Sequence, residues 1–387
     1  MNQGRSSMVI TSKMIRKNKA LRAIRKQSLK MFGKVKKGVI KNKIGKAVAC
    51  ESGMDAEMDW KKISGDLEQF LENNRVSLAA KPDAKTLIEA CKEAGLTGMS
   101  GNGFPVYQKL EGFLQSDASS KHIIINGVEC EPGLIHDQWL IDHHLDVIVK
   151  AAGILGKIFD GASVAIAAKG FPAAKGTIPT GVSLYQVPPV YPMGEEHILI
   201  RQVLGVILTP EETPIEKGIL VMNVQTLIQM FRVLSGESVN GRYVTLCDLD
   251  TGKAVAAYVD DKELIKDKLL GVFGQREYYK CGFGVMYAND VSGQDTFSPT
   301  ICFAAVASSV AGCSTENKCK GCGRCKRVCP MDINVKKVIT SLEKHQCEKL
   351  DELGVGRCIG CGSCSFVCAA GKSPHEMIGE YNAKIKG

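Results

Sequence analysis

Two runs of cysteine near the C-terminal end constrain the fold of this chain more than any other feature. Both runs have the spacing C-x2-C-x2-C-x3-C, and they consist of Cys319, Cys322, Cys325 and Cys329, and of Cys358, Cys361, Cys364 and Cys368. This spacing wraps a cubane [4Fe–4S] cluster, and in two-cluster ferredoxins the fourth cysteine of a run ligates the other cluster. The runs therefore predict one cluster on Cys319, Cys322, Cys325 and Cys368, and another on Cys358, Cys361, Cys364 and Cys329.

Two other uses of cysteine compete with this interpretation. Zinc sites also contain C-x2-C pairs, but a four-coordinate zinc ion does not favour three evenly spaced cysteines followed by a fourth. Disulfide frameworks are typical of short secreted chains, whereas this chain has 387 residues and is expected to lack a secretory signal. The other eight of the 16 cysteines have no ligand spacing, and most are expected to be buried as small apolar side chains. The predicted chemistry is the transfer of single electrons.

The positive charge of the chain is concentrated at one end. Residues 1–50 contain fifteen Lys and Arg and no Asp or Glu, although the whole chain has a net charge of +9. The remainder has 35 basic residues (50 less 15) against 41 acidic residues, and its net charge is −6. This asymmetry predicts a separate basic arm on a mildly acidic body.

Four interpretations of the basic arm remain open. It is a solvated or disordered tail, an amphipathic helix that docks on a partner subunit or an acidic electron carrier, a peripheral membrane anchor, or an organellar transit peptide. No motif indicates nucleic-acid binding. The longest apolar stretches, at 162–168 and 300–312, fall short of the ~20 residues that span a membrane. We expect a cytoplasmic protein without a transmembrane segment, with peripheral membrane contact through the arm as an alternative.

From residue 84 onward the chain has the pattern of an α/β protein. Short apolar runs bounded by turn residues alternate with segments of helical periodicity. The predicted strands are 122–125, 163–168, 184–187 and 218–222, the predicted helices include 86–95, 139–155, 194–204 and 224–234, and a small hairpin is predicted at 242–246 and 254–259. A glycine-rich loop at 98–105 precedes the helix that carries Lys109, and such a loop can hold a phosphate or a planar ring against its backbone.

Four motifs in this part have an order and spacing that resemble one family. They are Gly-Asn-Gly-Phe-Pro-x-x-x-Lys-Leu at 101–110, Asn-Gly-Val-Glu-Cys-Glu-Pro at 126–132, Tyr-Pro-Met-Gly-Glu-Glu at 191–196 and Met-Asn-Val-Gln-Thr at 222–226. With the cysteine runs, they resemble the C subunit of the Rnf electron-transport complex, which is similar to the FMN- and NADH-binding subunit of respiratory complex I. The resemblance covers about residues 85–387, and the basic arm stands where the family has a lipoyl-like domain.

The resemblance implies an α/β fold with three parts. These are a Rossmann-like FMN-binding domain, a small ubiquitin-like (SLBB-type) β-grasp segment and a C-terminal α-helical, ferredoxin-like domain with two [4Fe–4S] clusters. The expected boundaries are a basic arm at 1–50, a helix and linker at 51–84, the FMN/NADH-binding domain at 85–217, the SLBB-like segment and connection at 218–312, and the two-cluster domain at 313–387.

The resemblance also implies a set of cofactor-binding residues. The family binds FMN non-covalently and accepts hydride from NADH. The flavin or its phosphate would be held by Gly98, Gly101, Gly103 and Lys109. The flavin would also be contacted by Asn126, Glu129 and Asn223. NADH would be positioned beside Glu195 and Glu196. Taken alone, the glycines also fit a plain tight turn, and the two glutamates also fit helix-start carboxylates.

Several residues differ from the pattern of the family. Ser100 and Asn102 stand where the family usually has glycine and alanine, and Val106 stands where it has threonine. The later glycine-rich signature is here Cys-Gly-Phe-Gly-Val-Met at 281–286. Asn102 is bulkier than alanine and narrows the space for a ring that packs on the loop.

These observations predict an NAD(P)H-dependent iron–sulfur flavoprotein subunit. It would pass electrons from NAD(P)H through FMN to two [4Fe–4S] clusters, and then to a partner reductase, an electron-carrier protein or a cofactor such as cobalamin. The alternative is a flavin-free adaptor that docks a partner reductase and carries electrons through its clusters alone.

Overall fold

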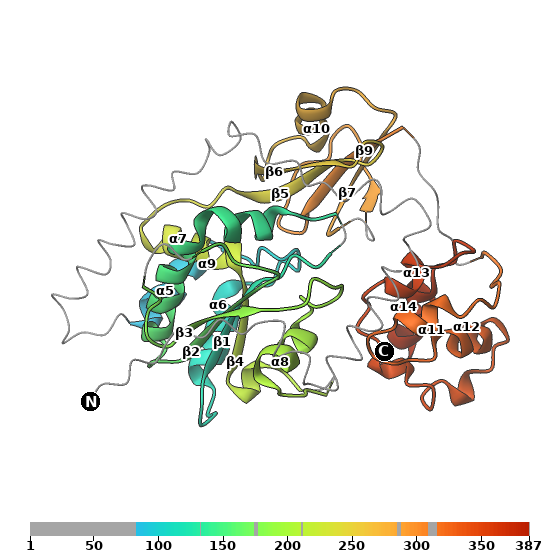
Figure 1. Cartoon of the computed structure of the whole chain (residues 1–387), viewed down its shortest axis with the longest axis horizontal. Coiled ribbons are helices and arrows are strands. Elements are labelled where there is room, and N and C mark those ends of the chain that lie inside the picture. The colour runs from blue at the N-terminus through green and yellow to red at the C-terminus, as the bar shows by residue number, and fades with distance from the viewer. Residues whose placement is uncertain are drawn as a thin grey trace.

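The computed structural model describes residues 83–386, with gaps at 132, 174–176, 210–211, 285–287 and 309–315. The predictions for the basic arm and for the linker at 51–84 fall on residues that lie almost wholly outside this part. The described chain forms a parallel-sheet unit, a second-sheet unit and a helical C-terminal unit (Figure 1). The predicted α/β fold class is confirmed by the parallel sheet and its helices.

A four-stranded parallel sheet forms the centre of the first unit. Its strands are β1 (His122–Gly127), β2 (Ser163–Ala168), β3 (Val182–Gln186) and β4 (Ile219–Asn223), in the order β3-β2-β1-β4. The chain builds outward from β1 through β2 to β3, and then returns to place β4 on the opposite side of β1. The strand order therefore reverses between β1 and β4, and open α/β sheets bind ligands at such a point, beyond the carboxyl ends of the strands.

Helices cover both faces of this sheet (Figure 1). One face packs against α5 (Ala84–Glu93), α6 (Val106–Gln115), α7 (His136–Ile158) and α9 (Val224–Leu234), and the other packs against α8 (Glu196–Leu204). Neighbouring residues of β1 point to opposite cores: Ile123 and Ile125 to the four-helix side, and Ile124 to α8. Full burial of each such side chain stabilises the fold by about 1.5–3 kcal/mol. A short 3-10 turn (Ile215–Lys217) leads into β4.

The second unit is a five-stranded mixed sheet. Its strands are β5 (Gly241–Asp248), β6 (Lys253–Asp260), β7 (Tyr278–Gly282), β8 (Ala288–Asp290) and β9 (Phe303–Ala307), in the order β6-β5-β9-β7-β8. The β5–β9 pair is parallel and the other three pairs are antiparallel. Helix α10 (Ile265–Phe273) packs on one face, while Tyr243 and Phe303 on the other face join cores that include residues of the first unit.

The first unit extends further than the sequence predicted. The expected boundary at 217/218 falls immediately before β4, but β4 pairs with β1 in the parallel sheet. Helix α9 follows β4 directly and packs in the same core. Residues 219–234 therefore belong to the first unit, because the register of β4 along β1 is a long-range pairing that local periodicity does not reveal.

The C-terminal unit is a small helical unit around the cysteine runs. It contains α11 (Arg324–Val328), α12 (Val335–Glu343), α13 (Ser363–Phe366) and α14 (Pro374–Lys386), with 3-10 turns at Cys347–Lys349 and Val355–Arg357. Its core includes Ile333, Val338 and Leu350 together with Cys329 and Cys364. Both α11 and α13 begin after a glycine in the left-handed region, Gly323 (φ 68°) and Gly362 (φ 70°). Within the described residues, no helix is long and apolar enough to span a bilayer.

Candidate functional site

A cavity of about 530 Å³ lies where β1 and β4 end. It is lined by residues 100–102, 126, 128–131, 134, 136–137, 191–192, 194–195, 223, 283, 302 and 359–361. These positions come from all three units of the described chain. The volume lies within the range of about 300–1,000 Å³ that is typical of cofactor and small-molecule sites.

The floor of the cavity is formed by two segments in close contact. The Asn126 side chain donates from Nδ2 to the Gly194 carbonyl at 2.9 Å and accepts at Oδ1 from the Val128 amide at 3.0 Å. A Cβ at Gly194 would lie 2.7 Å from the Val128 carbonyl oxygen and 3.1 Å from Cys130 Sγ. Only glycine allows this approach, so position 194 fixes the distance between the end of β1 and the segment that precedes α8.

The glycine-rich loop closes another side. Gly101 has a φ of +88°, and a Cβ there would overlap the Phe283 ring. The Met99 amide donates to Thr226 Oγ1 at 2.9 Å, and this contact anchors the loop to α9. Phe283 is 41% exposed and, like Gly101, lines the cavity. This side of the cavity therefore combines the backbone of the loop with the ring of Phe283, which comes from the second unit.

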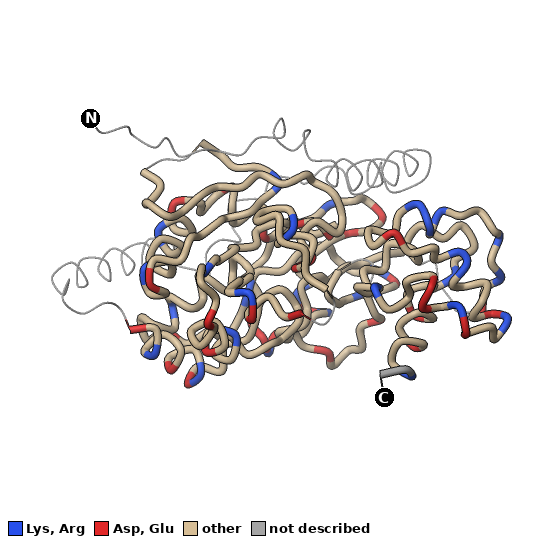
Figure 2. The backbone as a smooth tube through the Cα atoms, turned by 90° about the horizontal axis from the view of Figure 1, so that it is seen from below, with Lys and Arg blue, Asp and Glu red and all other residues tan. Residues whose placement is uncertain are grey.

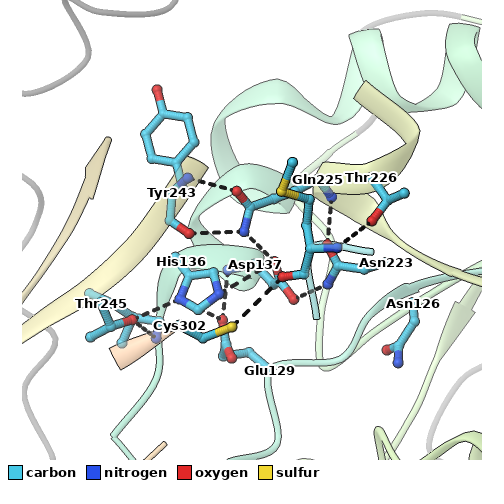
Figure 3. Close-up of polar contacts among 12 residues, drawn as sticks. Asn126, Glu129, His136, Asp137, Asn223, Gln225, Thr226, Tyr243, Thr245 and Cys302 are labelled. Carbon is cyan, nitrogen blue, oxygen red and sulfur yellow. Dashed lines mark hydrogen bonds and ion pairs between the residues drawn. The ribbon is translucent and has the colours of Figure 1, made fainter. Parts of the chain in front are cut away.

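A buried network of polar side chains forms part of the cavity wall (Figure 3). Glu129 Oε2 accepts from the Asp137 amide at 2.6 Å, and Asp137 accepts from Asn223 Nδ2 at 2.6 Å and from Gln225 Nε2 at 3.3 Å. His136 Nδ1 lies 2.9 Å from Thr245 Oγ1. The network ties the starts of α7 and α9 to the second sheet, because Thr245 belongs to β5.

Three members of this network, Glu129, His136 and Asp137, have ligand-type atoms within 4.8 Å of one another. Each of them already has a hydrogen-bond partner in the protein, among them Thr245 and Asn223. The arrangement therefore fits a closed hydrogen-bond network, which holds the polar wall of the cavity in place.

Burial, with a smaller effect of the Glu129 carboxylate, raises the pKa of Asp137 from 3.8 to about 6. The folded state therefore holds this proton more tightly than the unfolded chain, and the stabilising effect is lost as pH rises from about 4 to about 6. We expect this group to lower the free energy of unfolding by on the order of 1 kcal/mol between pH 5 and pH 7. Urea denaturation of the wild type and of Asp137→Asn over this range should give a flatter pH dependence for the variant. An equal pH dependence of the free energy of unfolding in the wild type and the variant would contradict the raised pKa of Asp137.

The structure brings together five of the nine cofactor-binding residues implied by the resemblance. Gly101, Asn126, Glu129, Glu195 and Asn223 line the cavity. Glu195 and Asn223 also cap helices, since they accept from the Ile198 amide at 3.0 Å and from the Gln225 amide at 2.8 Å. The starts of α8 and α9 therefore lie beside the cavity, each capped by a side chain of its wall.

The other four residues do not line the cavity: Gly98, Gly103, Lys109 and Glu196. The Gly98 amide donates to the Phe104 carbonyl at 2.8 Å, and both glycines shape the loop. Lys109 Nζ forms an ion pair with Glu196 Oε1 at 2.9 Å. This contact joins two residues that the resemblance assigned to different ligands, and the structure places the lysine charge outside the cavity lining.

Several lining residues were missed by the sequence predictions. Glu131, Cys130 and Tyr191 lie inside the family motifs, so the sequence could have indicated that they lie at the site. His136 and Asp137 lie in the first turn of α7, which was expected to begin only at about residue 139. Phe283 and Cys302 come from distant segments of the second unit, and no local pattern indicated that they reach the cavity.

The eight cysteines of the two runs lie around two separate hollows. One hollow is lined by Cys319, Cys322, Cys325 and Cys368, here called the outer set. The other is lined by Cys329, Cys358, Cys361 and Cys364, here called the inner set. Each set takes three cysteines from one run and the fourth from the other, which is the grouping expected for two cubane clusters.

Two cysteines of the inner set, Cys329 and Cys364, are buried, and the other two are partly buried. Burial raises the pKa of Cys329 to about 11 and raises the pKa of Cys364 as well, while two cysteines of the outer set, Cys319 and Cys322, are exposed. Because iron binds thiolates, metal binding at these sites must displace protons. The donor set, four sulfur atoms around a hollow, fits an iron–sulfur cluster in each case.

The inner set adjoins the cavity. Cys361 and Ile359 line both the cavity and the hollow of the inner set. The Tyr191 hydroxyl donates a hydrogen bond to the Cys361 carbonyl, and Tyr191 packs with Val328 in a small apolar cluster that includes Cys361. The inner set therefore lies next to the cavity, and the outer set lies farther from the cavity.

Comparisons with known proteins show what this chain is similar to. Residues 91–232 match the family described as the Nuo51 FMN-binding domain. The fold is similar to a chain in the crystal structure of the NAD+-reducing [NiFe]-hydrogenase in the air-oxidised state, with a TM-score of 0.55 and 16% identity over 76% of this chain and 60% of that chain.

Two kinds of curated relative are similar in sequence. The C subunit of the ion-translocating oxidoreductase complex of Yersinia pseudotuberculosis is 30% identical over 270 residues, which are 64% of this chain and 37% of that protein. The cobalamin reductase PduS of Citrobacter freundii is 30% identical over 158 residues, which are 39% of this chain and 34% of that protein. The matches thus span about a third of the length of these relatives. The predicted resemblance to the C subunit of the Rnf complex and to the FMN-binding domain of complex I is confirmed.

Proposed function

We propose that this chain is an FMN-containing iron–sulfur electron-transfer subunit, which takes electrons from NAD(P)H and delivers them one at a time to an acceptor. The observation that carries this proposal is the shared wall between the cavity and the inner cysteine set, formed by Ile359 and Cys361. A flavin site and a cluster site in contact suit the conversion of a hydride into single electrons. That conversion is the chemistry that FMN supplies when it is bound.

The cavity residues fit a cofactor that carries a polyol chain. Glu129, Glu131, Asp137 and Glu195 line the cavity, and carboxylates accept hydrogen bonds from ribityl or ribose hydroxyl groups. Gly101 would allow a planar ring to approach the loop backbone, and Asn126 and Asn223 would supply amide groups. The NAD+-reducing hydrogenase similarity and the family match support NAD(P)H and FMN as the ligands.

The cysteine sets would hold the two [4Fe–4S] clusters. We assign Cys319, Cys322, Cys325 and Cys368 to one cluster and Cys329, Cys358, Cys361 and Cys364 to the other, in a ferredoxin-like unit. The five-stranded sheet, which lies between the parallel sheet and this unit in the sequence, would be the SLBB-type segment. A partner reductase, an electron carrier or a cofactor such as cobalamin would be the acceptor, and the name of the Citrobacter relative supports the last. We place the chain in the cytoplasm or at the membrane surface.

Anaerobic cofactor analysis tests this function directly. We expect purified, reconstituted protein to contain about one FMN and about eight irons per chain. Addition of NADH should bleach the flavin absorbance and then reduce the clusters, as followed by optical and EPR spectra. A chain with about eight irons and no flavin after incubation with FMN would overturn the flavoprotein assignment.

A second candidate function is the flavin-free adaptor. It is favoured by the lining of the cavity, where no Lys or Arg occurs among the described residues, and by the pairing of Lys109 with Glu196. A flavin phosphate would then depend on backbone amides alone for its stabilisation. The same cofactor analysis separates the two functions, because the adaptor would contain iron but would have no flavin absorbance for NADH to bleach.

A further inference from the structure

The two cysteine sets differ in the charges that surround them. The hollow of the outer set is also lined by Lys320, Arg324, Lys336 and Lys372. By contrast, the described residues that line the hollow of the inner set include no Lys, Arg, Asp or Glu. Cations are therefore concentrated at only one of the two sets, the one that lies farther from the cavity.

Three of these cations face solvent. Lys320, Arg324 and Lys336 are exposed, and in the part of the chain that the structure describes none of them forms an ion pair with a carboxylate. Lys372 is different, because it is only 3% exposed and pairs with Glu343 at 3.2 Å. We call Lys320, Arg324 and Lys336 the basic rim. Cys319 and Cys322 of the outer set are also exposed, so the rim surrounds an accessible site.

The charge around the rim is not a general property of the C-terminal unit. Residues 316–345 contain eight Lys and Arg against three Asp and Glu, whereas residues 346–386 contain five of each kind. Figure 2 shows basic positions along the outer side of this unit, away from the parallel sheet. The basic rim thus stands at the end of the series that starts at the cavity and continues through the inner set.

We infer that the basic rim is the docking site of an acidic one-electron carrier protein. This inference rests on the proposed function, since it treats the outer set as the point where electrons leave. A negatively charged carrier would be drawn to the rim by long-range attraction and held with its redox centre beside the exposed cysteines. In each encounter the chain loses one electron and the oxidised centre of the carrier gains it, without transfer of a proton. An anionic membrane or a nucleic acid would meet the same cations but would accept no electron.

Charge reversal at the rim tests the inference by binding rather than by turnover. The triple variant Lys320→Glu/Arg324→Glu/Lys336→Glu should weaken the binding of a purified acidic [2Fe–2S] ferredoxin by about tenfold or more at low salt. The measurement is surface plasmon resonance with both proteins oxidised. The difference should shrink as ionic strength rises, because exposed charges are screened. The neutral triple Lys320→Gln/Arg324→Gln/Lys336→Gln should lie between the wild type and the reversed variant.

A matched control changes the net charge equally at a distance from the rim. Lys85→Glu/Lys253→Glu/Lys262→Glu alters three exposed lysines in the first two units and should bind the ferredoxin within about twofold of the wild type. Iron analysis of each preparation should give about eight irons per chain. A lower iron content in the wild type would contradict the proposed function, not the docking site. Equal affinity of the wild type and the reversed triple, no ferredoxin binding, or charge-dependent binding to phosphatidylserine vesicles in its place would overturn the inference.

Discussion

Cys329→Ser should remove the cluster of the second cysteine run, although Cys329 belongs to the first run. The structure groups Cys329 with Cys358, Cys361 and Cys364 around the hollow of the inner set. Loss of one of four thiolates should abolish that cluster, so iron should fall from about eight to about four per chain. Iron analysis and EPR of the reduced protein after anaerobic reconstitution measure this result.

Double variants decide which cysteines share a cluster. Cys329→Ser/Cys361→Ser should keep about four irons, because both changes affect the inner set. Cys329→Ser/Cys322→Ser should keep almost none, because it affects both sets. The opposite pattern would mean that each run binds its own cluster, and the grouping around the two hollows would then not describe the loaded protein.

Gly194→Ala should abolish tight flavin binding while the iron content remains unchanged. The added Cβ would lie 2.7 Å from the Val128 carbonyl oxygen, and a backbone atom cannot turn away as a flexible side chain can. The end of β1 and the segment before α8 must therefore separate, which moves Asn126 and Glu195 in the cavity wall. We expect the dissociation constant of FMN to rise about tenfold or more, with a loss of stability of about 1–3 kcal/mol.

Gly170→Ala provides the control for this change. A Cβ at Gly170 meets nothing within 4 Å, and its φ is outside the left-handed region, so FMN affinity should match that of the wild type. Fluorescence titration of FMN against both variants, with thermal unfolding in parallel, separates a local effect from general destabilisation. An unchanged FMN affinity in Gly194→Ala would remove this cavity as the flavin site.

Local patterns predicted the first unit well where strands and helices are bounded by strong signals. The predicted strand at 163–168 and helix at 224–234 coincide with β2 and α9, because an apolar run and a 3.6-residue periodicity are set by neighbouring residues. The hairpin of β5 and β6 was predicted for the same reason. The insertion of β9 between β5 and β7 was not, because parallel pairing of β5 with β9 joins segments that lie far apart in the chain.

The candidate site was predictable only in part. Motif residues such as Asn126 and Asn223 were identified, and their strands place them side by side in register. His136 and Asp137 were missed because two adjacent polar residues suggest an exposed helix start, and only distant partners such as Thr245 and Asn223 make their burial favourable. The resemblance assigned Lys109 to the flavin or its phosphate, and a motif does not reveal that this lysine forms an ion pair with Glu196.

The Tyr191–Cys361 contact has a consequence for the maturation of the protein. Residues 359–361 form a wall of the cavity and include Cys361, one of the cysteines that we propose to hold iron, so we expect iron insertion to order this segment. A newly made chain without iron would therefore have an incomplete flavin site, even if its parallel sheet had already folded. We expect the two cofactors to be acquired in sequence, iron before flavin, so that cells short of iron would accumulate the chain in a form that lacks both.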